Sequence, residues 1–332
     1  MSFSAQTIVE PDATSSGSLI SFLDLLACPV CGGQLDLAYP ALRCAGCARL
    51  YSPLPDSGAP VLLPSHDLGY EDAGPARALK SHVQERFATI DRSLPQPYDQ
   101  FATFLNLGYV ADGSPQFAVR GPARSLFNRN SAKLLFEVLG AAELDNRSVV
   151  ELGCGRGGNL AAIDRHYDGV RALGIDLSGA NIEFCRRRHT LRNGLFAVGD
   201  VEYLPVRASA ADVVLNLESS HYYPDRAKFF RETYRILKPG GVFLYADILQ
   251  VTEFGKVERY CREAGFETEI DRDISGNILL SCEEIAKIRE SRQHIGIYET
   301  FLVIPGSPEF EALRTGATRY RIIQMKKPPG EV

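Results

Sequence analysis

The sequence predicts an α/β protein with a mostly parallel, seven-stranded sheet, helices on both sheet faces and a small β-rich module at the N-terminal end. From Arg147 onward, short apolar runs rich in β-branched and aromatic residues alternate with amphipathic stretches long enough for crossover helices. Residues 266–274 and 318–327 alternate apolar with polar positions, which favours antiparallel strands near the sheet edge. Before this region stand two Cys-x-x-Cys pairs, which indicate a separate module.

Composition restricts the classes of function. A net charge of −5 disfavours nucleic acid as a partner held by bulk electrostatics. No apolar run approaches the roughly 18 residues of a membrane span, and no export signal precedes the module. We therefore expect a cytoplasmic protein whose eight cysteines are reduced thiols, with the four paired ones held by metal.

Four segments are expected. Residues 1–18 are small and polar and predict a flexible tail. Residues 19–65 form the cysteine module, residues 66–140 a helical linker and lid, and residues 141–332 the catalytic domain with a helical insertion at about 275–312. Within the linker, apolar spacing predicts helices over 76–87, around 98–109 and around 130–139, the last ending at Gly140.

A nucleotide site is indicated where the strands end. An apolar strand delivers Glu151, after which Gly153, Gly155 and Gly157 open a helix. Glycines let the chain turn tightly and let its backbone approach a ligand, although such a loop alone also serves NAD or flavin. The following two strands end in carboxylates that suit ribose hydroxyls and an adenine amino group, at Asp176-Leu177 and Asp200-Val201 respectively.

These pieces, followed by strands that end in NLESSH and YADI, resemble the Rossmann-like class I S-adenosylmethionine-dependent methyltransferases over residues 147–327. The resemblance implies S-adenosylmethionine as methyl donor and S-adenosylhomocysteine as product. It implies donor contacts from Tyr109, Glu151, Gly153, Gly155, Gly157, Asp176, Leu177, Asp200, Val201 and Asn216. Asn106 and Tyr109 resemble a lid over the donor.

The segment NLESSHYYPD, residues 216–225, resembles phthiotriolone and phenolphthiocerol O-methyltransferases, together with FLNLGY, DRDIS and PGSPEFEALRTGATRY. This implies methylation of a hydroxyl on an apolar, polyketide-like or lipid-like small molecule, free or carrier-bound, in natural product biosynthesis. His221 is the candidate general base, since its pKa suits proton transfer near neutrality. Glu218 is expected to orient the imidazole or to touch the amino acid end of the donor, and Asp247 is a candidate second carboxylate.

The cysteine pairs predict a structural zinc site. Cys28, Cys31, Cys44 and Cys47 can place four thiolates in a tetrahedron, with 12 residues between the pairs. The module resembles the zinc-ribbon family that activates methyltransferases, except that Ser52 separates Tyr51 from Pro53. We expect it to pack on the catalytic domain or to help wall the substrate site.

Other reaction classes stay open at this point. Some RNA base methyltransferases also begin with a zinc ribbon, and the donor site does not distinguish O-, N- and C-methylation. A non-catalytic scaffold with the same fold is a third reading. The acidic charge and the NLESSH segment favour a small-molecule acceptor.

Overall fold

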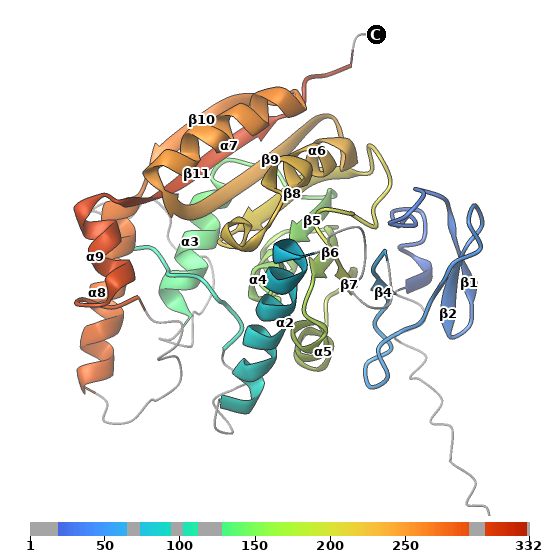
Figure 1. The fold of residues 1–332 in the computed structure, drawn as a ribbon, viewed down its shortest axis with the longest axis horizontal. Helices are drawn as coiled ribbons and strands as arrows, with labels where there is room; N and C mark the ends of the chain where they lie inside the picture. Colours follow the sequence, from blue (N-terminus) through green and yellow to red (C-terminus); the bar gives the residue numbers. More distant parts are fainter. Residues whose placement is uncertain (1–18, 65–73, 94–101, 112–127, 292–302, 331–332) are drawn as a thin grey trace, which may run out of the picture.

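The structure is a computed structural model that describes residues 19–64, 74–93, 102–111, 128–291 and 303–330 (Figure 1). The predicted tail at 1–18, the start of the helix expected near 98 and part of the expected insertion lie outside the described residues. In the described part of the chain, no helix is long and apolar enough to span a membrane.

An eight-stranded sheet forms the centre of the molecule, in the order β10-β11-β9-β8-β5-β6-β7-β4. Neighbouring strands from β4 to β9 run parallel, and β11 pairs antiparallel with both β9 and β10. The α/β class and the antiparallel C-terminal strands are thereby confirmed, whereas the sheet has eight strands and not the expected seven, because β4 from the N-terminal region adds to its edge. The strands are β4 (Val61–Leu62), β5 (Ser148–Leu152), β6 (Arg171–Asp176), β7 (Gly194–Gly199), β8 (Ala211–Leu217), β9 (Leu237–Gln250), β10 (Glu267–Asp273) and β11 (Thr318–Lys326).

Helices lie on both faces of the sheet (Figure 1), and three of them begin at a polar side-chain cap. Ser178, Asp225 and Ser307 each accept a hydrogen bond from a backbone N–H of the helix that follows. The helices are α2 (Pro75–Ser93), α3 (Arg129–Leu139), α4 (Gly158–His166), α5 (Gly179–Arg188), α6 (Arg226–Ile236), α7 (Val251–Ala264), α8 (Ser275–Ser291) and α9 (Pro308–Thr315), with a 3-10 turn η2 (Ser220–Tyr222). The helices predicted within 76–87 and near 130–139 are confirmed as α2 and α3.

The helix expected around 98–109 is wrong for its described part, because residues 102–111 contain no helix. The backbone of this segment bonds outward to other elements. The Thr103 carbonyl accepts the Gly158 N–H at 3.0 Å, and the Tyr109 N–H donates to the Asn130 carbonyl at 2.9 Å. Tertiary hydrogen bonds have therefore replaced the helical ones.

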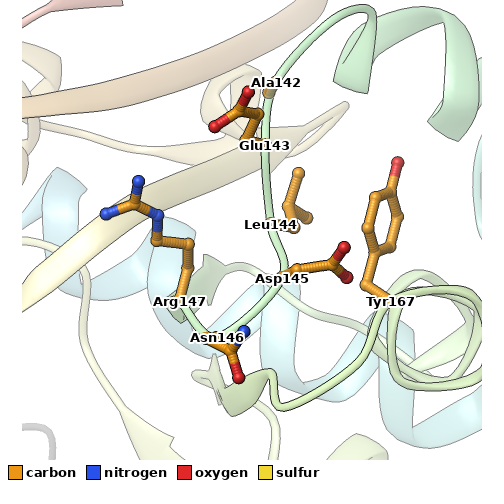
Figure 2. Close-up of a pocket in the computed structure, with 7 residues that line it drawn as sticks. All are labelled: Ala142, Glu143, Leu144, Asp145, Asn146, Arg147 and Tyr167. Carbon is orange, nitrogen blue, oxygen red and sulfur yellow. The ribbon is translucent and has the colours of Figure 1, made fainter.

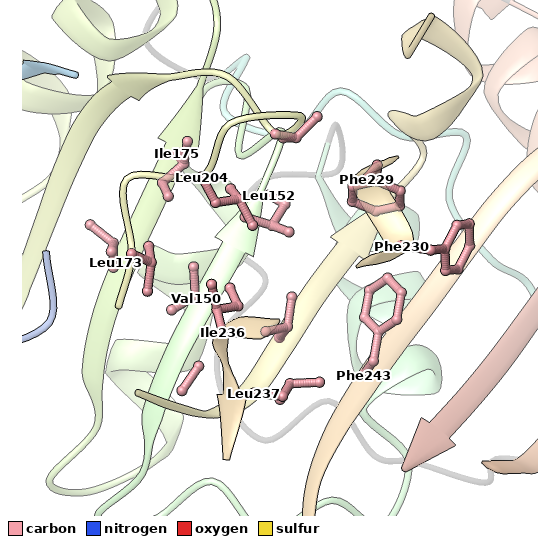
Figure 3. Packing of buried hydrophobic residues seen from close by; sticks show 14 of the residues in the cluster. Val150, Leu152, Leu173, Ile175, Leu204, Phe229, Phe230, Ile236, Leu237 and Phe243 are labelled. Carbon is pink, nitrogen blue, oxygen red and sulfur yellow. The ribbon is translucent and has the colours of Figure 1, made fainter. Parts of the chain in front are cut away.

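Two apolar clusters cover the two faces of the sheet. One contains Phe229 and Phe230 of α6, packed against Phe243 of β9, and extends under α7 (Figure 3). The other takes Leu134 from α3 and Ile182 from α5, among others. Because each face has its own buried core, the strands carry apolar residues on both sides, which explains their nearly continuous apolar runs.

The N-terminal module is joined to the edge of this sheet. Its own antiparallel sheet comprises β1 (Leu35–Ala38), β2 (Ala41–Cys44) and β3 (Leu50–Tyr51). Strand β4 then pairs with β7, with Val61 opposite Val198 and Leu62 opposite Gly199. Phe22 belongs to the same buried cluster as the catalytic strands. The module and the catalytic domain thus share both a sheet and a core.

A shallow hollow lies at the amino end of β5, between residues 142–147 and Tyr167 (Figure 2). In parallel α/β sheets ligands bind at the carboxyl ends of the strands, the opposite edge. The functional site is therefore built at that opposite edge.

Candidate active site

The glycine turn after β5 has no room for side chains. Gly153 and Cys154 both donate backbone hydrogen bonds to the Ile175 carbonyl, at 2.8 and 3.1 Å. Gly153 has φ +69°, and a Cβ there would lie 2.6 Å from the Tyr223 hydroxyl. Gly155 and Gly157 have φ +51° and +73°. The left-handed backbone and the close contact require glycine at this turn, as predicted for a loop that admits a ligand.

Beside this turn, two buried oxygens lack hydrogen-bond partners among the described residues. Glu151 accepts the Asn159 side-chain amide at 2.7 Å through Oε1. Its Oε2 and the Oδ1 atom of Asn159 are buried without a partner. Burial raises the pKa of Glu151 to about 8. Unpartnered buried acceptors are costly, so this pair suits a cationic ligand group such as an amino acid ammonium.

Asp176, at the end of β6, is buried and lies against the glycine turn. Its Oδ2 accepts the Gly155 N–H at 2.8 Å, and its Oδ1 accepts the Ser178 N–H at 2.8 Å. Burial raises its pKa. Since Ser178 caps α5, the carboxylate is not consumed as the helix cap. Oδ1 also accepts the Asn181 side-chain amide at 3.2 Å, whereas Oδ2 keeps a second lone pair that can accept from a ribose hydroxyl.

Asp200 follows β7 and is held by residues that sequence reasoning did not identify. Its Oδ1 accepts the Glu202 N–H at 2.8 Å, and its Oδ2 lies 2.9 Å from the Lys80 ammonium of α2. The Val201 N–H has no partner among the described residues, so it can face an adenine nitrogen. Sequence gave no signal for Lys80, because a helical lysine is ordinarily solvated.

A histidine–carboxylate pair lies between β8 and β9. His221 Nδ1 is 2.7 Å from Asp247 Oδ1, and the Asp247 side chain is 0% exposed against 26% for His221. Asp247 Oδ2 also accepts the Ser220 hydroxyl at 2.5 Å, which fixes the carboxylate. Burial alone would lower the pKa of His221, but the Asp247 charge outweighs it and the net pKa is raised.

The carboxylate that orients His221 is therefore Asp247, whereas Glu218 makes other contacts. Glu218 Oε2 accepts the Leu107 N–H and the Tyr320 hydroxyl, both at 3.0 Å. Burial raises the pKa of Glu218 to about 7. The expectation that Glu218 orients the imidazole is corrected, because the carboxylate in hydrogen-bond contact with the ring belongs to Asp247 of β9.

The segment 102–111 lies against the glycine turn through Leu105. A Cβ on Gly155 would lie 3.1 Å from Leu105 Cδ1. Asn106 turns its Oδ1 toward the Gly108 N–H at 3.0 Å, and Tyr109 packs against the cluster beneath α3 and α4. Leu105 is the side chain of this segment that contacts the turn.

Asn216 and the two tyrosines support the loop. The Asn216 amide donates to the Leu152 carbonyl at 2.8 Å and to the Tyr223 hydroxyl at 3.0 Å, which ties β8 to β5. The Tyr223 ring packs on Phe229. The Tyr222 ring lies 4.1 Å from the His221 ring, centroid to centroid. Tyr222 therefore borders the histidine, while Asn216 and Tyr223 stiffen the turn.

The four module cysteines converge. Their Sγ atoms lie within 4.8 Å of one another. Cys28 Sγ is 3.7 Å from Cys47 Sγ, and Cys31 Sγ is 3.4 Å from Cys44 Sγ. Four sulfurs at the usual Zn–S bond length would be separated by about 3.8 Å in a tetrahedron. The donor set and its spacing therefore fit a structural zinc ion.

A parallel sheet with a glycine turn and acids at three successive strand ends defines the class I S-adenosylmethionine-dependent methyltransferases. Residues 150–245 match the family model described as a methyltransferase domain. The chain is 32% identical over 240 residues to a fatty-acid O-methyltransferase of Mycolicibacterium smegmatis, a match that covers 69% of this chain and 85% of that protein. The chain belongs to the S-adenosylmethionine-dependent methyltransferases.

Two further comparisons agree. The chain is 34% identical over 197 residues to a Mycobacterium ulcerans protein named "Probable phthiotriol/phenolphthiotriol dimycocerosates methyltransferase 2", covering 59% of this chain and 76% of that protein. A solved geranyl diphosphate methyltransferase in complex with S-adenosylmethionine superposes with a TM-score of 0.53 at 20% identity, covering 68% of this chain and 99% of that one. The second likeness shows the fold.

Proposed function

We propose that this methyltransferase transfers a methyl group to a hydroxyl of an apolar, lipid-like acceptor, with His221 as general base. The observation that carries the proposal is the 2.7 Å contact between His221 Nδ1 and the fully buried Asp247. It leaves the other ring nitrogen, Nε2, without a protein partner among the described residues. The names of the two relatives, which denote a fatty acid and a phthiotriol as acceptors, support a lipid-like substrate.

The reaction requires little chemistry from the protein beyond removal of the hydroxyl proton. S-adenosylmethionine supplies a methyl group made electrophilic by its sulfonium. His221 Nε2 takes the hydroxyl proton while the acceptor oxygen bonds the methyl carbon and the carbon–sulfur bond breaks. Asp247 stabilises the imidazolium that forms and keeps the proton of the resting ring on Nδ1. The raised pKa of His221 makes it a stronger base than a free imidazole.

For the donor, we propose that the unpartnered oxygens of Glu151 and Asn159 hold the ammonium of its methionine end. Asp176 Oδ2 would accept a ribose hydroxyl, and Leu177 lies next to it. Asp200 would accept the adenine amino group, with the free Val201 N–H facing the ring. At Gly155 the absence of a side chain lets the backbone approach the ligand, and a Cβ there would lie 3.1 Å from Leu105 Cδ1.

We further propose that zinc occupies the four-thiolate site. All four protein ligands are then cysteines, which leaves no open position and gives the ion a folding role. Zinc binding would also stabilise the edge of the large sheet beside Asp200, because Leu62 of β4 pairs with Gly199. Zinc binding by such modules is coupled to their folding.

A second candidate reaction is methylation of a carboxylate, suggested by the name of the fatty-acid relative. An ionised carboxylate needs no general base, and a protonated His221 would hold it by charge. Against this reading, Asp247 already compensates that charge and Glu218 adds a second acid beside it. The surroundings of the histidine are thus better suited to a neutral acceptor.

The test uses a long-chain alcohol and the fatty acid of the same chain length as paired acceptors. His221→Ala should lower turnover of the alcohol about 10²- to 10⁴-fold while S-adenosylhomocysteine affinity stays within about twofold. His82→Ala, at an exposed position of α2, is the matched control and should leave both unchanged. A near-normal rate with the alcohol in His221→Ala removes the histidine from the mechanism; methylation of the fatty acid alone favours the second candidate.

A further inference from the structure

One face of α2 contacts three of the loops that build the site. Lys80, Gln84 and Phe87 are spaced as i, i+4 and i+7, so they lie along one side of the helix. Lys80 reaches Asp200, and Gln84 Nε2 donates to the Leu177 carbonyl at 2.9 Å. The Phe87 ring meets the Tyr222 ring edge-on at 5.8 Å. The helix therefore bridges the loops after β6, β7 and β8.

Lys80 is the charged contact on this face. Its ammonium lies 2.9 Å from Asp200 Oδ2 and 2.6 Å from Glu202 Oε2, and all three side chains are at most 3% exposed. The other Glu202 oxygen, Oε1, accepts the Asp225 N–H at 2.7 Å, so both oxygens of this carboxylate are held. The Lys80 ammonium therefore forms ion pairs with two buried carboxylates and fixes the position of both.

We propose that Lys80 is a positioning residue for the methyl donor: it aims the Asp200 carboxylate as the acceptor for the 6-amino group of adenine, and it fixes α2 across the adenosyl end. The inference rests on the donor placement under Proposed function. Lys80 at Oδ2 and the Glu202 N–H at Oδ1 together fix the orientation of the Asp200 carboxylate. Without the ammonium, the Asp200 carboxylate loses this restraint, and its hydrogen bond to the adenine amino group is weakened.

The test separates this role from a merely structural tie. S-adenosylhomocysteine is compared by calorimetry with its purine-riboside analogue, which carries hydrogen in place of the 6-amino group. The wild-type chain should bind the amino ligand roughly 10- to 100-fold more tightly, as a hydrogen bond to a charged acceptor predicts. Lys80→Met should reduce this preference to about threefold or less, and Lys80→Arg should restore most of it.

Two controls make each failure distinguishable. Asp200→Asn tests the donor placement itself: if the amino preference is unchanged in this variant, the adenine contact has been assigned to the wrong residue. If Asp200→Asn abolishes the preference and Lys80→Met weakens both ligands equally, the placement stands and the role of Lys80 is structural only. Glu85→Gln, exposed on the same helix, should match the wild type. Melting curves of Lys80→Met and Lys80→Arg show whether each variant is folded.

Discussion

Replacing Asp247 by Asn tests the proposed general base, His221, most directly. The carboxylate accepts four hydrogen bonds: from His221 Nδ1 at 2.7 Å, from the His221 N–H at 3.1 Å, from the Ser220 hydroxyl at 2.5 Å and from the Ile248 N–H at 2.8 Å. An asparagine has the same shape but only one acceptor oxygen. Its NH₂ group must then face at least one donor, and the negative charge beside the ring is lost.

The expected loss follows from these contacts. A hydrogen bond between the charged pair contributes about 1.5–3 kcal/mol, so its loss from the transition state lowers kcat/KM about 10- to 150-fold. If the asparagine NH₂ turns the imidazole into the other tautomer, the loss grows toward about 10⁴-fold. The pKa of His221 should also fall, because burial, which lowers it, is no longer opposed by Asp247.

The assay is kcat/KM for a hydroxylated acceptor as a function of pH. The base must be neutral, so activity of the wild-type enzyme should rise with pH through the raised pKa of His221, above the ordinary value of 6.5. In Asp247→Asn the plateau should be lower and should be reached at a lower pH. Asp271→Asn, in a surface ion pair with Arg321, is the control and should change neither quantity.

The reasoning also requires that the two residues act as a unit. The double variant His221→Ala with Asp247→Asn should be no slower than His221→Ala alone, within about threefold. Additive losses, or an Asp247→Asn enzyme with an unshifted pH profile, would refute a catalytic pair and leave Asp247 as a structural carboxylate.

Three further outcomes are expected. With a carboxylate acceptor the pH dependence should reverse, since binding by a protonated His221 is lost as pH rises through its raised pKa; the same rising profile for alcohol and acid would contradict the distinction between the two acceptors. Gly155→Ala should weaken S-adenosylhomocysteine binding at least about tenfold in calorimetry and lower stability by about 1 kcal/mol, because φ is +51° there; unchanged affinity would place the ligand elsewhere. Removal of metal by a chelator should release one zinc per chain, lower the melting temperature and weaken S-adenosylhomocysteine binding, whereas an unaltered melting curve would show that the thiolates need no ion.

Sequence predicted the parts of the site that depend on local backbone geometry. Gly153, Gly155 and Gly157 were identified because a strand-to-helix turn with positive φ requires glycine, and all three have it. Asp176 and Asp200 were found because parallel strands end at one edge of the sheet. The cysteine spacing likewise predicted the convergence of four thiols.

Contacts between distant segments were not predictable in the same way. Asp247 was noted only as a possible second carboxylate, because its 26-residue separation from His221 has no local pattern; the parallel pairing of β8 with β9 brings them together. Lys80 is 120 residues from Asp200 on an ordinary amphipathic helix. The segment 102–111 was predicted to be helical because its apolar spacing fits a helix. The same spacing also fits an extended segment whose backbone bonds to neighbouring elements, and these tertiary hydrogen bonds determine its conformation.

The pairing of β4 with β7 gives the N-terminal module a physical reason to be part of this chain. Strand β7 would otherwise form the edge of the sheet, with unpaired backbone groups immediately before Asp200. The Val198 N–H instead donates to the Pro60 carbonyl at 2.9 Å, and Leu62 lies opposite Gly199. The last strand residues before the proposed adenine carboxylate are thus held by a segment whose own fold contains the four thiols. We therefore expect folding of the module and order at the adenine end of the proposed donor site to be coupled through strand β4.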